Sequence, residues 1–194
     1  VLVSHGLSQV EQICDHAAWI DKGNLKELGT ALEVVRAYSG QAHNALPREE
    51  GEIGDRWGSG EALITKVEMF SEGKVSSLFR TGKPLRIRVH YDAPTPISDA
   101  VVGVRITHLH GMNVWGSNTK RKGVQIPKLF GTGHVDLDID SLPLLEGTYD
   151  LTIALSDLAE VSPFDHWEKR IRFDVHQHDT FDEGTVNIEG RWTV

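Results

Sequence analysis

The chain has 194 residues, a formal net charge of −8 at neutral pH and a single cysteine. This length accommodates one large or two small domains, and the acidic balance offers no basic surface to a nucleic-acid partner. One cysteine excludes an internal disulfide and fits a reducing compartment. No apolar run reaches the roughly 20 residues of a membrane-spanning helix. The chain starts inside what reads as a strand, so we expect it to be a fragment of a longer protein.

The first forty residues predict a short α/β segment. An apolar run, Val1–Ser4, reads as the end of a buried strand and is followed directly by His5. A capped helix comes next, and residues 17–28 then place two short apolar stretches around a turn with aspartate and glycine, which is typical of a hairpin. Residues 30–33, Thr-Ala-Leu-Glu, match a capping box and predict that a second helix begins there.

Residues 41–60 predict an extended linker. They show no hydrophobic periodicity and are rich in glycine and charge. Trp57 is the exception in this polar stretch. We expect its ring to dock on the edge of the following domain, and contact with a ligand is the alternative.

From Glu61 onward the chain predicts antiparallel β-structure. Apolar and polar residues alternate with a period of two, most clearly in residues 131–156. The predicted strands are Ala62–Phe70, Val75–Phe79, Leu85–Asp92, Ala100–Leu109, Asn113–Ser117, His134–Asp140, Thr148–Ser156 and Lys169–His176, with Gly184–Glu189 as an edge segment. Turns are expected between them, one of them at Pro94–Pro96. Many short strands at regular spacing predict a two-sheet β-sandwich.

Tyr149 stands at the start of one of these strands, two residues after Gly147. A sandwich domain can place a tyrosine corner at such a point, with the ring buried and the hydroxyl bonded back to the preceding connection. An ordinary core tyrosine is the alternative.

The order of elements in the first forty residues resembles the last part of an ABC-transporter nucleotide-binding domain. The resemblance rests on Val1–His5, Asp15–Gly23 and Gly29–Thr30. In that family the histidine after the strand contacts the γ-phosphate of ATP and helps to position the attacking water. The resemblance therefore implies that His5 is this catalytic histidine in the full-length ATPase. A histidine that caps a strand end is the alternative.

The phosphate-binding part of such an ATPase is missing from this sequence. It contains no G-x-x-x-x-G-K-[ST] loop, and no acidic residue ends an apolar strand before His5. We therefore expect no cofactor and no enzymatic activity in this fragment, whereas the full-length protein is expected to bind ATP and magnesium and to hydrolyse ATP.

The chain from Gly54 to Trp192 resembles another known module. The matching segments are Gly54–Ile64, Thr81–Leu85, Gly103–Ile106, Val114–Thr119, Gly147–Tyr149 and Gly190–Trp192. Together they are similar to the C-terminal glycan-binding domain of Wzt-type ATP-binding subunits, which export O-antigen polysaccharide. The resemblance implies an immunoglobulin-like antiparallel β-sandwich, a polysaccharide ligand, a homodimer, a transmembrane permease partner and a cytoplasmic location at the inner face of the membrane. The expected division is ABC fragment 1–40, linker 41–60 and sandwich 61–194.

A sugar site would combine an aromatic ring with planar polar groups for the hydroxyls. If Val104 and its alternate neighbours point inward, Arg105 and Thr107 point outward, and the next strand of the hairpin is expected to bring Trp115 to the same surface. The candidate glycan-binding residues are Trp115, Arg105, Thr107, Asn118, Thr152 and Arg172. The alternatives are burial or a dimer contact for Trp115, and a solvated face for the polar residues.

Two other patterns in the sequence could indicate chemical sites. His-x-His pairs at 108–110 and 176–178 suit two metal ligands each, but no third ligand is obvious, so we expect no metal site. Asp136, Asp138 and Asp140 line one strand face. We expect a solvated sheet exterior rather than glycosidase acids, since such acids come from different elements and one of them lies in an apolar pocket.

The leading hypothesis is therefore a glycan-binding module that performs no chemistry of its own. The alternative is a dimerisation or docking module of the transporter ATPase without direct glycan recognition. A glycan hydrolase is disfavoured because no credible acid–base pair is present.

Overall fold

The computed structural model describes residues 10, 13–21, 23–42, 54–160, 162–177 and 182–193. The chain divides into two compact units, residues 1–45 and 46–194, and each is described by itself. His5 and most of the predicted linker lie outside the described residues. No helix within the described ranges is long and apolar enough to cross a membrane.

The described part of the first unit is a hairpin followed by a helix. Strands β1 (His16–Asp21) and β2 (Asn24–Thr30) pair antiparallel, and helix α2 spans Ala31–Ala42. The carboxylate of Glu33 accepts a hydrogen bond from the Thr30 amide (3.0 Å), and the Thr30 hydroxyl oxygen accepts one from the Glu33 amide (3.3 Å). This reciprocal pair satisfies two otherwise unpaired amides at the helix start. The predicted hairpin and capping box are confirmed.

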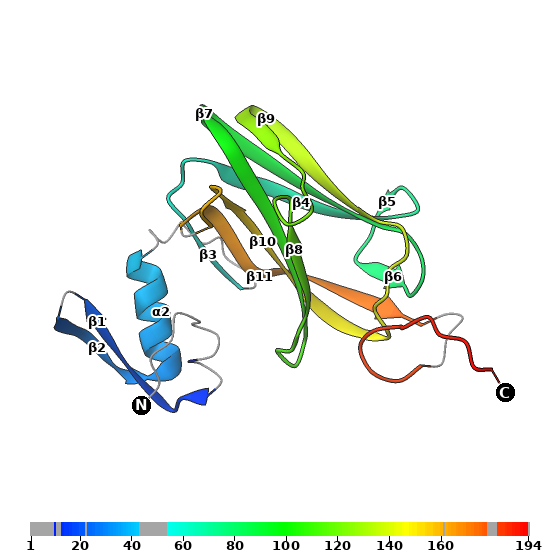
Figure 1. Cartoon of the computed structure of the whole chain (residues 1–194), viewed down its shortest axis with the longest axis horizontal. Coiled ribbons are helices and arrows are strands. Elements are labelled where there is room, and N and C mark those ends of the chain that lie inside the picture. The colour runs from blue at the N-terminus through cyan, green and yellow to red at the C-terminus, as the bar shows by residue number, and fades with distance from the viewer. Residues whose placement is uncertain are drawn as a thin grey trace. The chain divides into compact units, whose positions relative to one another are not determined.

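The described residues of the second unit form two packed sheets (Figure 1). The strands are β3 (Asp55–Trp57), β4 (Leu63–Ser71), β5 (Lys74–Val75), β6 (Leu78–Arg80), β7 (Leu85–His108), β8 (Asn113–Asn118), β9 (Ile126–Ile139), β10 (Gly147–Ser156) and β11 (Pro163–His176). Sheet I has the order β5–β4–β7–β9, and sheet II has the order β3–β11–β10–β7–β8, with β6 parallel to the end of β11. The predicted immunoglobulin-like β-sandwich is confirmed.

Strand β7 belongs to both sheets. The sequence predicted two strands with a turn at Pro94–Pro96, but the structure has one strand of 24 residues. Strand β9 follows it through the bend, because Ala93 pairs with Gly131 and the next pair along β7 is Ile97 with Leu129. Proline donates no ladder hydrogen bond, and here the register skips both prolines. The predicted turn is therefore wrong, and the prolines mark the crossing from one sheet to the other.

The connection from β9 to β10 also crosses between the sheets. Strand β9 lies in sheet I and β10 in sheet II, and the linking segment carries Leu142, Leu144 and Leu145, all of them buried. Their side chains bury apolar area where the two sheets are joined, which stabilises the sandwich.

Tyr149 ties this connection to the core. Its ring is fully buried and lies 5.6 Å from the ring of Phe173. Its hydroxyl donates to the Leu145 carbonyl oxygen at 2.8 Å, and the Thr185 carbonyl oxygen lies 3.3 Å from the same hydroxyl. The sequence left open a tyrosine corner or an ordinary core tyrosine, and this geometry is that of the tyrosine corner.

Replacing Tyr149 by phenylalanine should lower the free energy of unfolding of the sandwich by about 1–2 kcal/mol, because the buried Leu145 carbonyl oxygen loses its hydroxyl donor while the ring stays in place. Urea unfolding measures the change. The control is Tyr38→Phe, whose ring is exposed, and it should change the value by less than about 0.5 kcal/mol. Equal effects of the two substitutions would contradict the tyrosine corner.

Candidate functional site

The outer face of sheet II brings together most of the polar residues selected from the sequence. The strand register aligns Trp57, His166, Ala154, Gly103 and Asn118 in one row across β3, β11, β10, β7 and β8. Directly opposite residues on paired strands share a face. The centre of this row therefore carries small side chains, with larger side chains on either side.

A second row on the same face contains Thr152, Arg105 and Gly116. Strand β11 opposes this row with an irregularity, because its register against β10 shifts between Ile171 and Trp167. The extra residues place the backbone amide of Lys169 within 2.9 Å of the Thr152 hydroxyl oxygen, to which it donates. A bulge at this point re-aims the side chains on either side of it.

Glu168 connects the two rows electrostatically. The His166 Nε2 atom lies 2.9 Å from its carboxylate, and the Arg105 Nη1 atom lies 3.8 Å from it. Burial acts to raise the pKa of Glu168, but the hydrogen bond from His166 and the positive charges of His166, Arg105 and Lys169 outweigh burial and hold this pKa below the ordinary value. The carboxylate therefore stays ionised and holds a partly exposed guanidinium beside an imidazole.

A third row on this face is built by Arg172, Asp150 and Thr107. The Arg172 guanidinium binds both carboxylate oxygens of Asp150, at 2.8 and 3.2 Å. Paired hydrogen bonds of this kind fix the plane of the guanidinium. Arg172 stays 47% exposed in its side chain, so it remains accessible to solvent.

The structure separates the six predicted glycan-binding residues into three groups. Arg105, Arg172 and Asn118 are at least partly exposed on the outer face of sheet II. Thr107 and Thr152 lie on the same face but are only 3% and 2% exposed. Their side chains are therefore covered by neighbouring residues and do not reach solvent.

Trp115 is the exception, and its expected position is wrong. The register pairs Trp115 with the buried Ile106 and pairs Gly116 with Arg105. An irregularity between Ile106 and Thr107 inserts Val114 into β8, and a one-residue slip moves every following side chain to the opposite face. The Trp115 side chain is therefore partly buried and packs against the core, where part of its apolar area is removed from water.

The aromatic residue on this face is Trp57. Its ring stacks on that of His166, with 4.1 Å between centroids and 14° between planes. The prediction that Trp57 docks on the edge of the sandwich is confirmed, because β3 pairs with β11. The sequence signal for it was a tryptophan in an otherwise polar linker, flanked by Arg56 and Gly58.

Strand β3 is held from its other side by a buried ion pair. The Arg56 guanidinium donates to both carboxylate oxygens of Asp165, at 3.0 and 2.7 Å, and to the Ile64 carbonyl oxygen at 3.2 Å. Asp165 is fully buried and also accepts from the Ile64 amide at 2.7 Å. The guanidinium of Arg56, the carboxylate of Asp165 and the backbone of Ile64 are therefore hydrogen-bonded to one another. The buried charge of Asp165 has a counter-charge, as a buried charge requires.

Two glycines allow β3 to lie directly on β11. A Cβ atom on Gly54 would collide with the Glu168 carbonyl oxygen, and one on Gly58 would collide with the Phe164 carbonyl oxygen. Gly54 also has a positive φ of 71°, which residues with a side chain rarely adopt. The close approach fixes the position from which Trp57 reaches the outer face.

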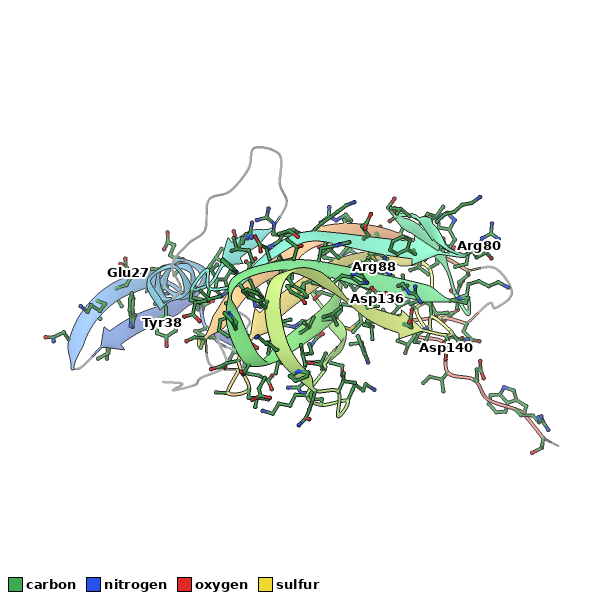
Figure 2. The ribbon with its side chains drawn as sticks, turned by 90° about the horizontal axis from the view of Figure 1, so that it is seen from above. Glu27, Tyr38, Arg80, Arg88, Asp136 and Asp140 are labelled. Atoms are coloured by element: carbon green, nitrogen blue, oxygen red, sulfur yellow. The ribbon has the colours of Figure 1, made fainter. Side chains whose placement is uncertain are left out.

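The outer face of sheet I carries a network of ion pairs. Arg88 and Asp136 lie side by side on this face (Figure 2), and Arg88 binds both oxygens of Asp136, at 2.8 and 2.7 Å. Arg86 binds Asp138 at 2.6 Å. The hydrogen bond from Arg88 is the main cause that lowers the pKa of Asp136 below its ordinary value. These two aspartates thus lie on the sheet exterior as expected, but paired with arginines rather than merely solvated.

A hollow of about 520 Å³ opens at one end of this face. Phe70, Arg86 and Asp138 are among its lining residues. Arg86 is already hydrogen-bonded to Asp138, so a ligand there would compete with an existing ion pair.

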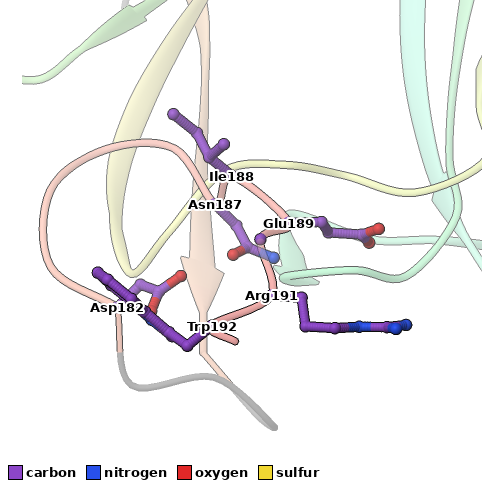
Figure 3. A pocket seen from close by; sticks show the side chains of 7 residues that line it. Asp182, Asn187, Ile188, Glu189, Arg191 and Trp192 are labelled. Atoms are coloured by element: carbon purple, nitrogen blue, oxygen red, sulfur yellow. The ribbon is translucent and has the colours of Figure 1, made fainter. Parts of the chain in front are cut away.

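A second hollow, of about 560 Å³, lies at the end of the chain (Figure 3). It is lined by Asp182 and residues 187–192, so the terminal segment alone encloses it. Trp192 is 100% exposed, and Ile188 is also exposed. A single extended segment without packing on these side chains does not provide a preformed binding site.

The described residues provide no cluster of metal ligands. Within the described ranges, no group of three or more histidine, cysteine, aspartate or glutamate residues is arranged to hold a metal ion. The rings of His108 and His110 lie 5.0 Å apart, and His108 contacts the ring of Tyr149. His178 lies outside the described residues.

Residues 54–188 match the family described as the Wzt C-terminal domain. The chain belongs to this family. A crystal structure of the C-terminal domain of wzt superposes on this Wzt domain with a TM-score of 0.65 and 17% sequence identity, covering 81% of this chain and 95% of that chain. The likeness establishes a shared fold.

Among curated proteins, this chain is similar to ATP-binding proteins of export systems. It is 24% identical over 173 residues to the O-antigen export system ATP-binding protein RfbB of Myxococcus xanthus, covering 79% of this chain and 39% of that protein. It is 53% identical over 38 residues to the teichoic acids export ATP-binding protein TagH of Levilactobacillus brevis, covering 20% of this chain and 10% of that protein. The chain thus spans about two fifths of the length of RfbB.

Replacing Asp165 by asparagine should lower the free energy of unfolding of the Wzt domain by about 3 kcal/mol or more, because the buried Arg56 guanidinium loses its counter-charge. Asp138→Asn removes an exposed partner and should cost less than about 1 kcal/mol. Urea unfolding compares the two. A similar small loss for both would contradict the view that Asp165 anchors β3.

The depressed pKa of Glu168 predicts a pH-dependent contribution to stability. Because the folded pKa lies below the unfolded one, the stabilisation is fully present above about pH 4.5 and is lost as the pH falls through the folded pKa. The difference in unfolding free energy between the unmodified chain and Glu168→Gln should therefore shrink as the pH drops below 4.5. Glu146→Gln, at an exposed position, is the control. A difference in unfolding free energy that stays constant down to pH 3 would contradict the lowered pKa of Glu168.

Proposed function

We propose that this chain is the carbohydrate-binding part of an ABC exporter's ATP-binding subunit and that it recognises an O-antigen-type polysaccharide on the outer face of sheet II. Membership of the Wzt C-terminal domain family supports the class of function, and similarity to RfbB supports the class of polymer. The observation that carries the location is that a stacked aromatic pair and exposed guanidinium and amide groups share one face.

The chemistry of this face suits a sugar. An aromatic ring packs against the C–H face of a pyranose, while guanidinium, carboxylate and amide groups exchange hydrogen bonds with hydroxyls. Arg105, Glu168 and Asn118 supply one of each group. The Asn118 side-chain amide donates to Glu160 at 2.8 Å, which fixes its orientation. Prior orientation lowers the entropy lost on binding.

The chain does no chemistry alone in this proposal. Its first unit is the end of the ABC domain, and the phosphate-binding loop belongs to a preceding part of the full-length subunit. There the subunit binds ATP and magnesium, and His5 acts at the γ-phosphate. The subunit works on the cytoplasmic side of the membrane, attached to a transmembrane permease.

A second candidate is a dimerisation or docking module without direct glycan recognition. The terminal segment favours it, because Val186, Ile188 and Trp192 are all exposed apolar residues. Exposed apolar side chains in one short segment are typical of a surface that a partner covers. A homodimer is compatible with both candidates.

Calorimetric titration of the chain with purified O-antigen polysaccharides, released from lipid A, tests the proposal. Arg105→Ala should raise the dissociation constant about tenfold or more, because hydrogen bonds to a charged group are lost. Arg86→Ala removes an arginine of similar exposure from the outer face of sheet I and should leave the constant unchanged. An equal rise of the dissociation constant in both variants would contradict a binding site on sheet II. Absence of binding together with a stable dimer would favour the docking role.

A further inference from the structure

Strand β3 brings a residue from the end of the predicted linker into the outer face of sheet II. It consists of Asp55, Arg56 and Trp57 only, and it belongs to the second unit, although the sequence predicted these residues as part of the linker 41–60. Successive side chains of a strand point to opposite faces. Arg56 therefore turns to the buried cluster with Asp165, and Trp57 turns to the outer face.

Contacts other than those of the Trp57 indole also attach β3 to the sheet. Three hydrogen bonds from Arg56 and the close approach of Gly54 and Gly58 to β11 already hold the strand. A smaller apolar residue could close this edge of the sheet. Trp57 instead places the largest side chain among the amino acids, partly exposed, on a polar face. Partly exposed aromatic rings on polar faces are typical of contact surfaces.

From Trp57 a continuous series of contacts runs into the face. The indole stacks on the His166 imidazole at 4.1 Å, the imidazole lies 2.9 Å from the Glu168 carboxylate, and that carboxylate lies 3.8 Å from the Arg105 guanidinium. Exposure of the side chains rises along this series, from 13% for His166 to 24% for Glu168 and 41% for Arg105. A molecule bound beside Arg105 would therefore rest against groups whose positions are set by the linker strand.

We propose that one pyranose ring of the polysaccharide packs against the Trp57–His166 pair while its neighbouring hydroxyls bind Glu168 and Arg105. Trp57 is then a specificity-determining residue that the linker contributes to the binding face. Occupancy of the face stabilises the pairing of β3 with β11 and so reaches the linker directly. This inference rests on the proposed function. It adds that Trp57 contacts the sugar and that the pairing of β3 with β11 transmits binding to the linker.

The sugar chemistry that fits is a pyranose with two adjacent equatorial hydroxyls. Such a pair spaces its oxygens for the carboxylate of Glu168 on one side and the guanidinium of Arg105 on the other. The same ring presents an apolar C–H face to the aromatic pair. Removal or methylation of one of these hydroxyls leaves a polar group of the face without its partner, which costs affinity.

The test measures binding and backbone protection together in the whole chain. Dissociation constants for a purified O-antigen polysaccharide are determined for the unmodified chain, Trp57→Ala, Trp57→Phe and the control Phe130→Ala, whose ring is exposed on β9. We expect Trp57→Ala to weaken binding about tenfold, Trp57→Phe to weaken it by about threefold or less, and Phe130→Ala to have no effect. Hydrogen exchange of residues 54–59 should slow by about tenfold when the polysaccharide is bound.

The outcomes separate the inference from the proposed function. If the unmodified chain binds, Trp57→Ala binds equally well and residues 54–59 gain no protection, the inference is overturned and glycan recognition stands. If the unmodified chain binds no polysaccharide, the proposed function fails and the inference with it. If Trp57→Ala does not fold, as judged by its thermal transition, Trp57→Phe and the exchange of the unmodified chain decide: protection supports the inference, and unchanged exchange overturns it.

Discussion

The hydrogen bonding of β7 into both sheets decides which side chains reach solvent on each outer face. Its first half pairs with β4 and β9. After the bend, residues 97–100 continue along β9, and the rest of the second half pairs with β10 and β8. Each half alternates between core and exterior, so Arg86 and Arg88 reach one outer face while Arg105 and Thr107 reach the other. The bend without regular pairing between these halves lets one strand build two surfaces of different character.

The two outer faces differ in how their charges are satisfied. On sheet I, arginine and aspartate side chains from neighbouring strands hold one another in paired hydrogen bonds. Such pairs leave little free hydrogen-bonding capacity, and a ligand would have to displace them. On sheet II, Arg172 and Asp150 form a similar pair, but Arg105 lies 3.8 Å from its counter-charge and stays 41% exposed, beside an aromatic stack and small side chains. This face therefore offers both unused hydrogen-bonding capacity and space for a ligand.

Local patterns in the sequence predicted the elements well. Strict alternation predicted the strands, a Gly-x-Tyr sequence left open the tyrosine corner that Tyr149 forms, and the spacing of Thr30 and Glu33 predicted a helix start. These features depend on residues close together in the chain, so their physical cause is visible in the sequence.

What the sequence could not predict depends on register between strands. The unpaired Val114 shifts the register of β8 by one residue, so that Trp115 faces the core. No local feature of the hairpin sequence indicates this shift. The prolines at 94 and 96 were interpreted as a turn because their tolerance within β7 depends on where β9 lies. Likewise, only the pairing of β3 with β11 brings Trp57 beside His166, 109 positions further along the chain.

The central claim is that the outer face of sheet II is the binding face. A map of backbone amide chemical shifts by solution NMR, recorded with and without a purified O-antigen polysaccharide, tests it most directly. The account predicts that shift changes concentrate on β3, β8, β10, β11 and the second half of β7. Changes concentrated on β4, β9 and the first half of β7, or on the terminal segment, would contradict it.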